Sequence, residues 1–213
     1  MILRVLRKFL TTGQKWILSL LKQSGLKNLK INKKKFIYLV SPTKIDKHFY
    51  NELIAILKQK KVSYFQLRLK KEDFKKKLII GKKIKRICKK FNVKFIINDD
   101  VYLAKKLNSD GCHLGQKDMN ISDARKLIGN KIIGITCHNS IKLAKVASSN
   151  KADYIAFGAF NTSITKKVKY KASVNLIKKA RKITKIPIVA IGGINFNNYK
   201  NLLLNKANFL AIS

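Results

Sequence analysis

The chain has 213 residues, of which 46% are hydrophobic, so it is long enough for one globular domain with a sizeable core. Its 48 lysines and arginines against 10 aspartates and glutamates give a formal charge of +38, which taken alone indicates an anionic partner. The basic residues are nearly all lysines spread over every expected helix, without clustered arginines or aromatic side chains, so we attribute the charge to coding bias and expect no specific nucleic-acid partner.

Residues 1–35 form an N-terminal extension that differs from the rest of the chain. Apolar side chains in 2–10 and 16–21 alternate with lysine and arginine, which predicts a basic amphipathic segment. No apolar run is long enough for a membrane span, and no small-residue cleavage site indicates a signal peptide. Packing on the domain or disorder is favoured over contact with an anionic membrane.

From residue 36 onward, apolar runs alternate with amphipathic stretches, which predicts strands alternating with helices. The runs cover residues 36–40, 62–70, 94–99, 111–114, 131–137, 153–159, 186–193 and 208–213. Eight such units favour a compact α/β fold, a (β/α)8 TIM barrel over residues 36–213, with a doubly wound open sheet as the alternative. The sequence stops on the eighth strand, so the final helix is missing or shortened, or the extension takes its place.

Polar side chains follow the second predicted strand. Alternation places Gln66, Arg68 and Lys70 on one side of the strand and Leu67 and Leu69 on the other. Polar groups that face into a barrel are costly unless a polar ligand binds them or they form an internal polar plug. We favour a ligand.

Two aspartates follow neighbouring strands. A short helical stretch separates the run that ends at Asn98 and Asp99 from the run that precedes Asp118. Such a crossover makes the strands parallel, so both carboxylates lie at one edge of the sheet. Paired carboxylates suit Mg2+ shared with a substrate phosphate. The alternative, two solvated turn residues, is equally weighted.

A second group of candidates follows strands five to seven. Thr136 and His138 close the fifth run, Ser163, Thr165 and Lys166 follow the sixth, and Gly192 and Gly193 follow the seventh. Bare glycine amides beside hydroxyl groups are typical of phosphate-binding loops in barrels. The sequence therefore predicts two sites, a metal-and-cation end near strands two to four and a neutral hydroxyl-and-glycine cradle near strands six to eight.

Together these motifs resemble the family of thiamine phosphate synthases and related thiazole tautomerases. The resemblance covers most of residues 36–213 and rests on residues 66–70, 97–99, 110–118, 134–138, 165–166 and 190–194. It implies a transferase that joins a pyrimidine methyl diphosphate to a thiazole phosphate and releases diphosphate.

The resemblance also implies residue roles. Gln66, Arg68, Lys70 and Asn98 would hold the pyrimidine diphosphate, Asp99 and Asp118 would bind Mg2+, and Thr136 would stand where serine usually contacts the diphosphate. The thiazole phosphate would be held by Ser163, Thr165, Lys166, Gly193, Ile212 and Ser213. Among these, Arg68, Lys70, Thr136 and Lys166 would be catalytic.

The sequence departs from the family pattern at four positions. Leu69 stands where an acidic residue is common and Asp100 where arginine is common, and Ala159 and Thr162 replace prolines. A thiazole tautomerase or an inactive homologue is therefore the second hypothesis, and a basic nucleic-acid or membrane-surface protein is a distant third. The sequence is also compatible with a homo-oligomer.

The three cysteines complete the sequence picture. Cys88, Cys112 and Cys137 lie in apolar runs without CxxC spacing, which is typical of buried thiols in a reducing compartment. We expect a cytoplasmic protein.

Overall fold

The computed structural model describes residues 35–161, 169–195 and 197–213. The expected extension, 1–35, therefore lies almost wholly outside the described residues, and so do Ser163, Thr165 and Lys166. No described helix is long and apolar enough to cross a membrane.

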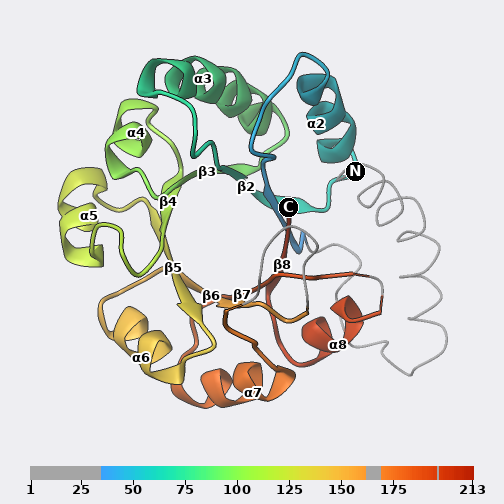
Figure 1. The fold of residues 1–213 in the computed structure, drawn as a ribbon, viewed down its shortest axis with the longest axis vertical. Coiled ribbons are helices and arrows are strands. Elements are labelled where there is room, and N and C mark those ends of the chain that lie inside the picture. Colours follow the sequence, from blue (N-terminus) through green and yellow to red (C-terminus); the bar gives the residue numbers. More distant parts are fainter. Residues whose placement is uncertain (1–34, 162–168, 196) are drawn as a thin grey trace.

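The described chain alternates strands with helices and closes into a barrel (Figure 1). The elements in order are β1 (Ile37–Val40), α2 (Phe49–Leu57), β2 (Val62–Leu67), α3 (Phe74–Lys90), β3 (Lys94–Asn98), α4 (Val101–Lys106), β4 (Gly111–Leu114), α5 (Ile121–Ile128), β5 (Ile132–His138), α6 (Ile141–Ser149), β6 (Tyr154–Gly158), α7 (Val174–Ile183), β7 (Ile188–Ile191), α8 (Tyr199–Leu204) and β8 (Phe209–Ile212).

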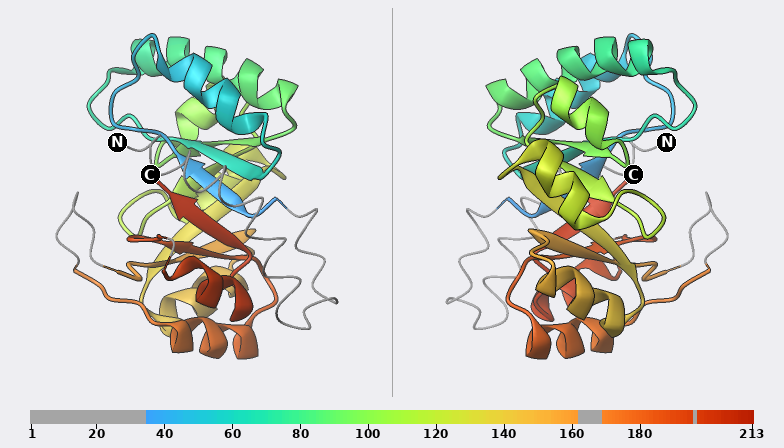
Figure 2. Two further views of the ribbon diagram at one scale, coloured as in Figure 1. Left: turned by 90° about the vertical axis from the view of Figure 1, so that its right-hand side faces the viewer. Right: turned by 90° about the vertical axis from the view of Figure 1, so that its left-hand side faces the viewer.

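Closure of the sheet decides between the two predicted folds. Strand β1 pairs in parallel with both β2 and β8, so the sheet has no free edge. The (β/α)8 prediction is confirmed, and the open doubly wound sheet is excluded. Figure 2 shows from two sides that the helices lie outside the tilted strands. Among the described residues, no helix follows β8.

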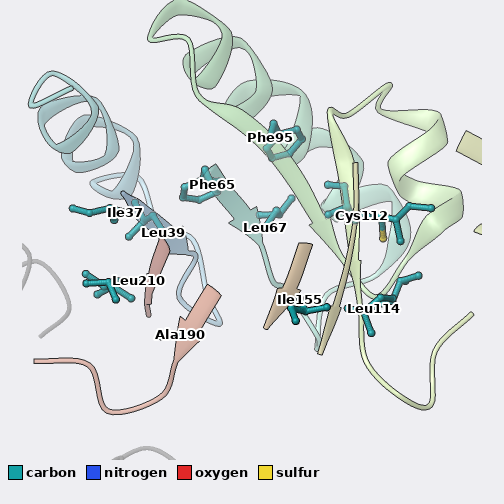
Figure 3. Packing of buried hydrophobic residues seen from close by; sticks show 14 of the residues in the cluster. Ile37, Leu39, Phe65, Leu67, Phe95, Cys112, Leu114, Ile155, Ala190 and Leu210 are labelled. Carbon is teal, nitrogen blue, oxygen red and sulfur yellow. The ribbon is translucent and has the colours of Figure 1, made fainter. Parts of the chain in front are cut away.

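The main core lies between the strands and the surrounding helices. Alternate strand residues such as Ile37, Leu39, Phe65 and Phe95 are almost fully buried there, and Figure 3 shows them on neighbouring strands. Amphipathic helices bury the apolar face of each βα unit, which is why one core surrounds the whole barrel. The three cysteines are free and buried, as predicted.

A second, smaller cluster fills the inside of the barrel. Its buried members are Tyr38, Val40, Tyr154, Ala156, Val189 and Ala211. These residues belong to the opposite side of the strand alternation, so they point inward rather than towards the helices. Two of them, Tyr38 and Tyr154, carry hydroxyl groups, which need hydrogen-bond partners inside the barrel because water does not reach them.

Candidate active site

The carboxyl ends of β1, β2 and β3 are joined by side-chain hydrogen bonds. Gln66 is buried at the end of β2, and its Nε2 donates to Asn98 Oδ1 at 3.1 Å. The backbone N–H of Arg68 donates to Ser41 Oγ at 2.8 Å, just beyond β1. Sequence reasoning missed Ser41 because one serine after a strand carries no signal. These contacts align the polar residues of β2 with those of β3.

Strand β2 is shorter than the sequence predicted. It ends at Leu67, so Arg68 and Lys70 lie on the following loop. Leu67 and Leu69 are buried in the outer core, as the alternation indicated, but Lys70 is exposed rather than turned into the barrel. The guanidinium of Arg68 has no hydrogen-bond partner among the described residues and is only partly exposed. The Arg68 guanidinium is therefore available to an anion, whereas Lys70 already lies against the Asp99 carboxylate.

The first residue after β3 has an unusual backbone. Asp99 has a φ of 64°, and its N–H donates to the His113 carbonyl oxygen at 2.8 Å. Positive φ is uncommon outside glycine, although aspartate tolerates it better than most residues. The Asp99 carboxylate lies 3.2 Å from Lys70 Nζ. The turn thus places an acidic group against a cation at the barrel mouth.

Asp118, on the loop after β4, also lies at this end of the barrel. Its Oδ2 accepts a hydrogen bond from the Gly115 N–H at 2.7 Å. Burial and then the nearby Asp99 carboxylate raise the pKa of Asp118, whereas the Gly115 N–H and Lys70 act in the opposite direction. The predicted meeting of Asp99 and Asp118 is therefore observed, and their mutual repulsion favours a cation between or beside them.

These residues fit a magnesium ion by their chemistry. Hard oxygen ligands are what Mg2+ prefers, and it commonly takes one or two carboxylates with substrate phosphates and water. The described residues hold no cluster of three or more histidine, cysteine, aspartate or glutamate side chains. Asp99 and Asp118 supply two carboxylates of the kind that such an ion takes.

A cavity of about 220 Å3 opens beside Asp99 and Lys70. It lies against the ends of β2 and β3 and the first turns of α3 and α4. Its lining residues are Leu67, Leu69, Lys70, Lys77, Ile97, Asn98, Asp99, Asp100 and Leu103. Asp100, where the family commonly has arginine, caps α4 by accepting from the Leu103 N–H at 2.8 Å.

The imidazole of His113 points into the barrel from β4. Its Nδ1 is 2.9 Å from the Tyr154 hydroxyl and its Nε2 is 2.8 Å from Thr136 Oγ1. Burial lowers the pKa of His113 to about 4, although Asp118 opposes this shift. The ring is therefore neutral at physiological pH, and both nitrogens are already engaged. By contrast, the His138 ring stacks on Tyr170 with centroids 4.3 Å apart.

The expected phosphate cradle is only partly described. Gly193 has a φ of 66°, and a Cβ there would lie 2.6 Å from the Asn161 Cβ, so the close approach of the β6 and β7 loops requires glycine. Ile212 is the buried end of β8, and Ser213 follows it exposed. Ser163, Thr165 and Lys166 lie outside the described residues, so their positions in this cradle stay predictions.

The fold and these residues define a (β/α)8 barrel whose carboxyl edge is suited to a phosphorylated substrate. A sequence model described as thiamine monophosphate synthase matches residues 37–213. A thiamine-phosphate synthase of Pelagibacter ubique is 66% identical over 189 residues, which is 88% of this chain and 91% of that protein. This chain belongs to the thiamine monophosphate synthase family.

Other similar proteins agree. A thiamine-phosphate synthase of Nitrosomonas eutropha is 41% identical over 153 residues, covering 71% of this chain and 72% of that protein. Among solved structures, a thiamine phosphate pyrophosphorylase from Pyrococcus furiosus has a TM-score of 0.75 at 26% identity and covers 85% of this chain and 86% of its own. A tryptophan synthase α-subunit from the same organism, at 11% identity and a TM-score of 0.60 over 84% of this chain and 87% of its own, shares the fold alone.

Proposed function

We propose that this chain joins 4-amino-2-methyl-5-(diphosphooxymethyl)pyrimidine to a thiazole phosphate and releases diphosphate. The observation that carries the proposal is the convergence of Lys70, Asp99 and Asp118 at the carboxyl edge of β2–β4. In the reaction, the bond between the methylene carbon and the diphosphate breaks, and the same carbon forms a bond to the thiazole nitrogen. The diphosphate leaves with the electron pair of the broken bond.

The residues after β2 suit the departure of a diphosphate. A leaving group that gains negative charge is stabilised by fixed cations in place before the reaction. Arg68 and Lys70 lie on the loop after β2, and the guanidinium of Arg68 has no described partner to displace. Gln66 and Asn98 form a hydrogen-bonded amide pair below them, suited to the uncharged pyrimidine. The electron-rich pyrimidine stabilises the developing cation, so no general base is essential.

The two aspartates would hold magnesium against the diphosphate. When bound there, Mg2+ neutralises charge on the leaving group. Burial first, and then the neighbouring Asp99, raise the pKa of Asp118, and a divalent cation beside the pair would offset both effects. Magnesium dependence is part of this proposal.

The thiazole phosphate would lie on the opposite side of the barrel mouth. Gly193 and the Ile212–Ser213 pair stand after β7 and β8, and Ser163, Thr165 and Lys166 are assigned there by the family resemblance alone. In this proposal the pyrimidine diphosphate lies at the ends of β2–β4 and the thiazole phosphate at the ends of β6–β8.

The test is a diphosphate-release assay with each substrate alone and with both together. Release that requires both substrates supports the synthase. Isomerisation of the thiazole phosphate without any diphosphate release would instead indicate a tautomerase, which needs a base but no grip on diphosphate. Lys71→Ala, a change in an exposed lysine next to the site, is the matched control for Lys70→Ala.

A further inference from the structure

A continuous hydrogen-bonded chain crosses the inside of the barrel and ends at the proposed active site. The Tyr38 and Tyr154 hydroxyls are 2.7 Å apart, and the Tyr154 hydroxyl is 2.9 Å from His113 Nδ1. On its other side, His113 Nε2 is 2.8 Å from Thr136 Oγ1. The four groups come from β1, β6, β4 and β5. None of the roles proposed above uses the two tyrosines.

The barrel is built to hold Tyr154 in this place. Gly134 of β5 stands opposite Tyr154 in the register, and a Cβ at Gly134 would lie 1.8 Å from Tyr154 Cζ. The ring also stacks on His113 with centroids 5.5 Å apart and meets Tyr38 edge-on at 5.7 Å. Both tyrosines are at most 2% exposed. The Tyr154 hydroxyl therefore has a fixed position.

The chain of hydrogen bonds can run in only two directions, because a Tyr154 hydroxyl that accepted from both neighbours would leave its own buried hydrogen without an acceptor. Each hydroxyl has one hydrogen, and a neutral imidazole has one N–H. In the first direction, Tyr38 donates to Tyr154, Tyr154 donates to His113 Nδ1, and Nε2–H donates to Thr136. In the second, every donor is reversed, so that Thr136 donates to Nε2 and Tyr154 donates to Tyr38.

Burial decides between the two directions. In the reversed chain, the hydroxyl hydrogen of Tyr38 would have no acceptor, because Tyr154 is the only partner of that hydroxyl among the described residues. A buried donor without an acceptor is costly. In the first direction both tyrosine hydroxyls and the His113 Nε2–H each donate to an acceptor inside the barrel. The Thr136 hydroxyl hydrogen alone has no acceptor in this hydrogen-bonded chain, and Thr136 is the member nearest the proposed active site.

We propose that Tyr38 and Tyr154 are positioning residues that hold His113 as its Nε2–H tautomer, so that the Thr136 hydroxyl donates its hydrogen to an anionic substrate oxygen. The substrate class is a diphosphate, and in this respect the inference rests on the proposed function. A reversed chain would turn an oxygen lone pair towards the anion and repel it. The buried tyrosines would thereby affect a group that they do not touch.

The first experiment needs no substrate and no variant. Nitrogen-15 NMR of histidine-labelled protein distinguishes protonated from unprotonated ring nitrogens, and we expect His113 to be protonated at Nε2 and not at Nδ1. Protonation at Nδ1 would overturn the inference. This result is independent of the reaction, so it stands or fails separately from the proposed synthase activity.

The second experiment measures the dissociation constant of inorganic diphosphate with Mg2+ by calorimetry. Tyr154→Phe removes the donor to Nδ1, and we expect binding about three- to tenfold weaker together with a mixture of His113 tautomers. Tyr64→Phe is the matched control, because its ring contacts Tyr154 at 5.9 Å while its hydroxyl has no described hydrogen bond. Thr136→Val combined with Tyr154→Phe should bind no more weakly than Thr136→Val alone. Additive losses, or wild-type binding by Tyr154→Phe, would contradict the inference.

Discussion

Lys70 and Asp99, which follow β2 and β3, form an ion pair of 3.2 Å at the barrel mouth. Both side chains are partly exposed, so this contact itself adds little stability. The pair also affects Asp118 on the loop after β4, because Asp99 raises the pKa of Asp118 and Lys70 lowers it. The two carboxylates beside Lys70 suit a divalent cation, which would in turn neutralise the diphosphate of the proposed function.

We expect Asp99→Asn to reduce diphosphate release at least a hundredfold while the protein stays folded. The change removes one carboxylate from the proposed magnesium site and keeps the side-chain shape. Activity is measured with both substrates, and folding by circular dichroism. Asp123→Asn is the control, because Asp123 lies exposed at the start of α5. A wild-type rate for Asp99→Asn, or for the native protein in excess chelator, would disprove the metal role.

We expect Arg68→Ala and Lys70→Ala to remove most activity with the pyrimidine diphosphate, by about two to three orders of magnitude each. His113→Ala should lower it only modestly, because a reaction driven by ionisation of the diphosphate needs no base. The readout is again diphosphate release. The opposite order of effects would favour proton-transfer chemistry at His113 and hence a tautomerase.

Gly134→Ala should destabilise the barrel by roughly 3 kcal/mol or more. The new methyl group would overlap the Tyr154 ring, whose Cζ lies 1.8 Å from the ideal Cβ position. Urea unfolding measures the change. The double variant with Tyr154→Ala should be more stable than the sum of the single effects, because the overlap is then gone. Unchanged stability of Gly134→Ala would show that the ring does not lie there.

Protein stability should fall as the pH is lowered from about 6.5 towards 4. Burial lowers the pKa of His113 to about 4 from the ordinary value of 6.5, so in that range the unfolded chain takes up a proton that the folded protein excludes. Proton binding by the unfolded state alone lowers the free energy of unfolding, by at most about 3 kcal/mol here. His113→Gln should flatten this part of the profile. An identical slope in wild type and variant would place the pH sensitivity elsewhere.

Binding to nucleic acid should be weak and without sequence preference. The charge of +38 is spread along the chain, so any binding would come from phosphate contacts and should collapse between low and physiological salt. Fluorescence anisotropy with two unrelated oligonucleotides measures this. Tight, sequence-selective binding at physiological salt would promote the nucleic-acid hypothesis over a compositional origin of the charge.

The order of the elements could be read from the sequence because their patterns are local. Each strand from residue 36 onward is an apolar run, and each run lies within a few residues of an observed strand. The one large difference is β2, which ends at Leu67 rather than at residue 70. The alternation of buried leucines continues to Leu69, because Leu69 is also buried in the outer core. The strand itself ends earlier, so the apolar pattern extends beyond the strand pairing.

The meeting of Asp99 and Asp118 could also be predicted, since parallel strands joined by a short crossover bring their carboxyl ends together. The sequence pattern did not reveal the partners of those residues. Nothing local links Ser41 to Arg68, because their contact depends on how β1 lies beside β2.

The role of the barrel interior was decided by tertiary structure alone. Tyr154 begins an apolar run and looks like any buried strand residue, and Gly134 looks like a weak point in a strand. Only closure of the sheet places Tyr38, Tyr154 and His113 around one enclosed space, where each hydroxyl must find its partner on another strand. Sequence alone determined which residues form the barrel and which of them follow its strands, because periodicity and chain order are local properties. The hydrogen-bond partners across the barrel follow from burial, which exists only once the sheet has closed.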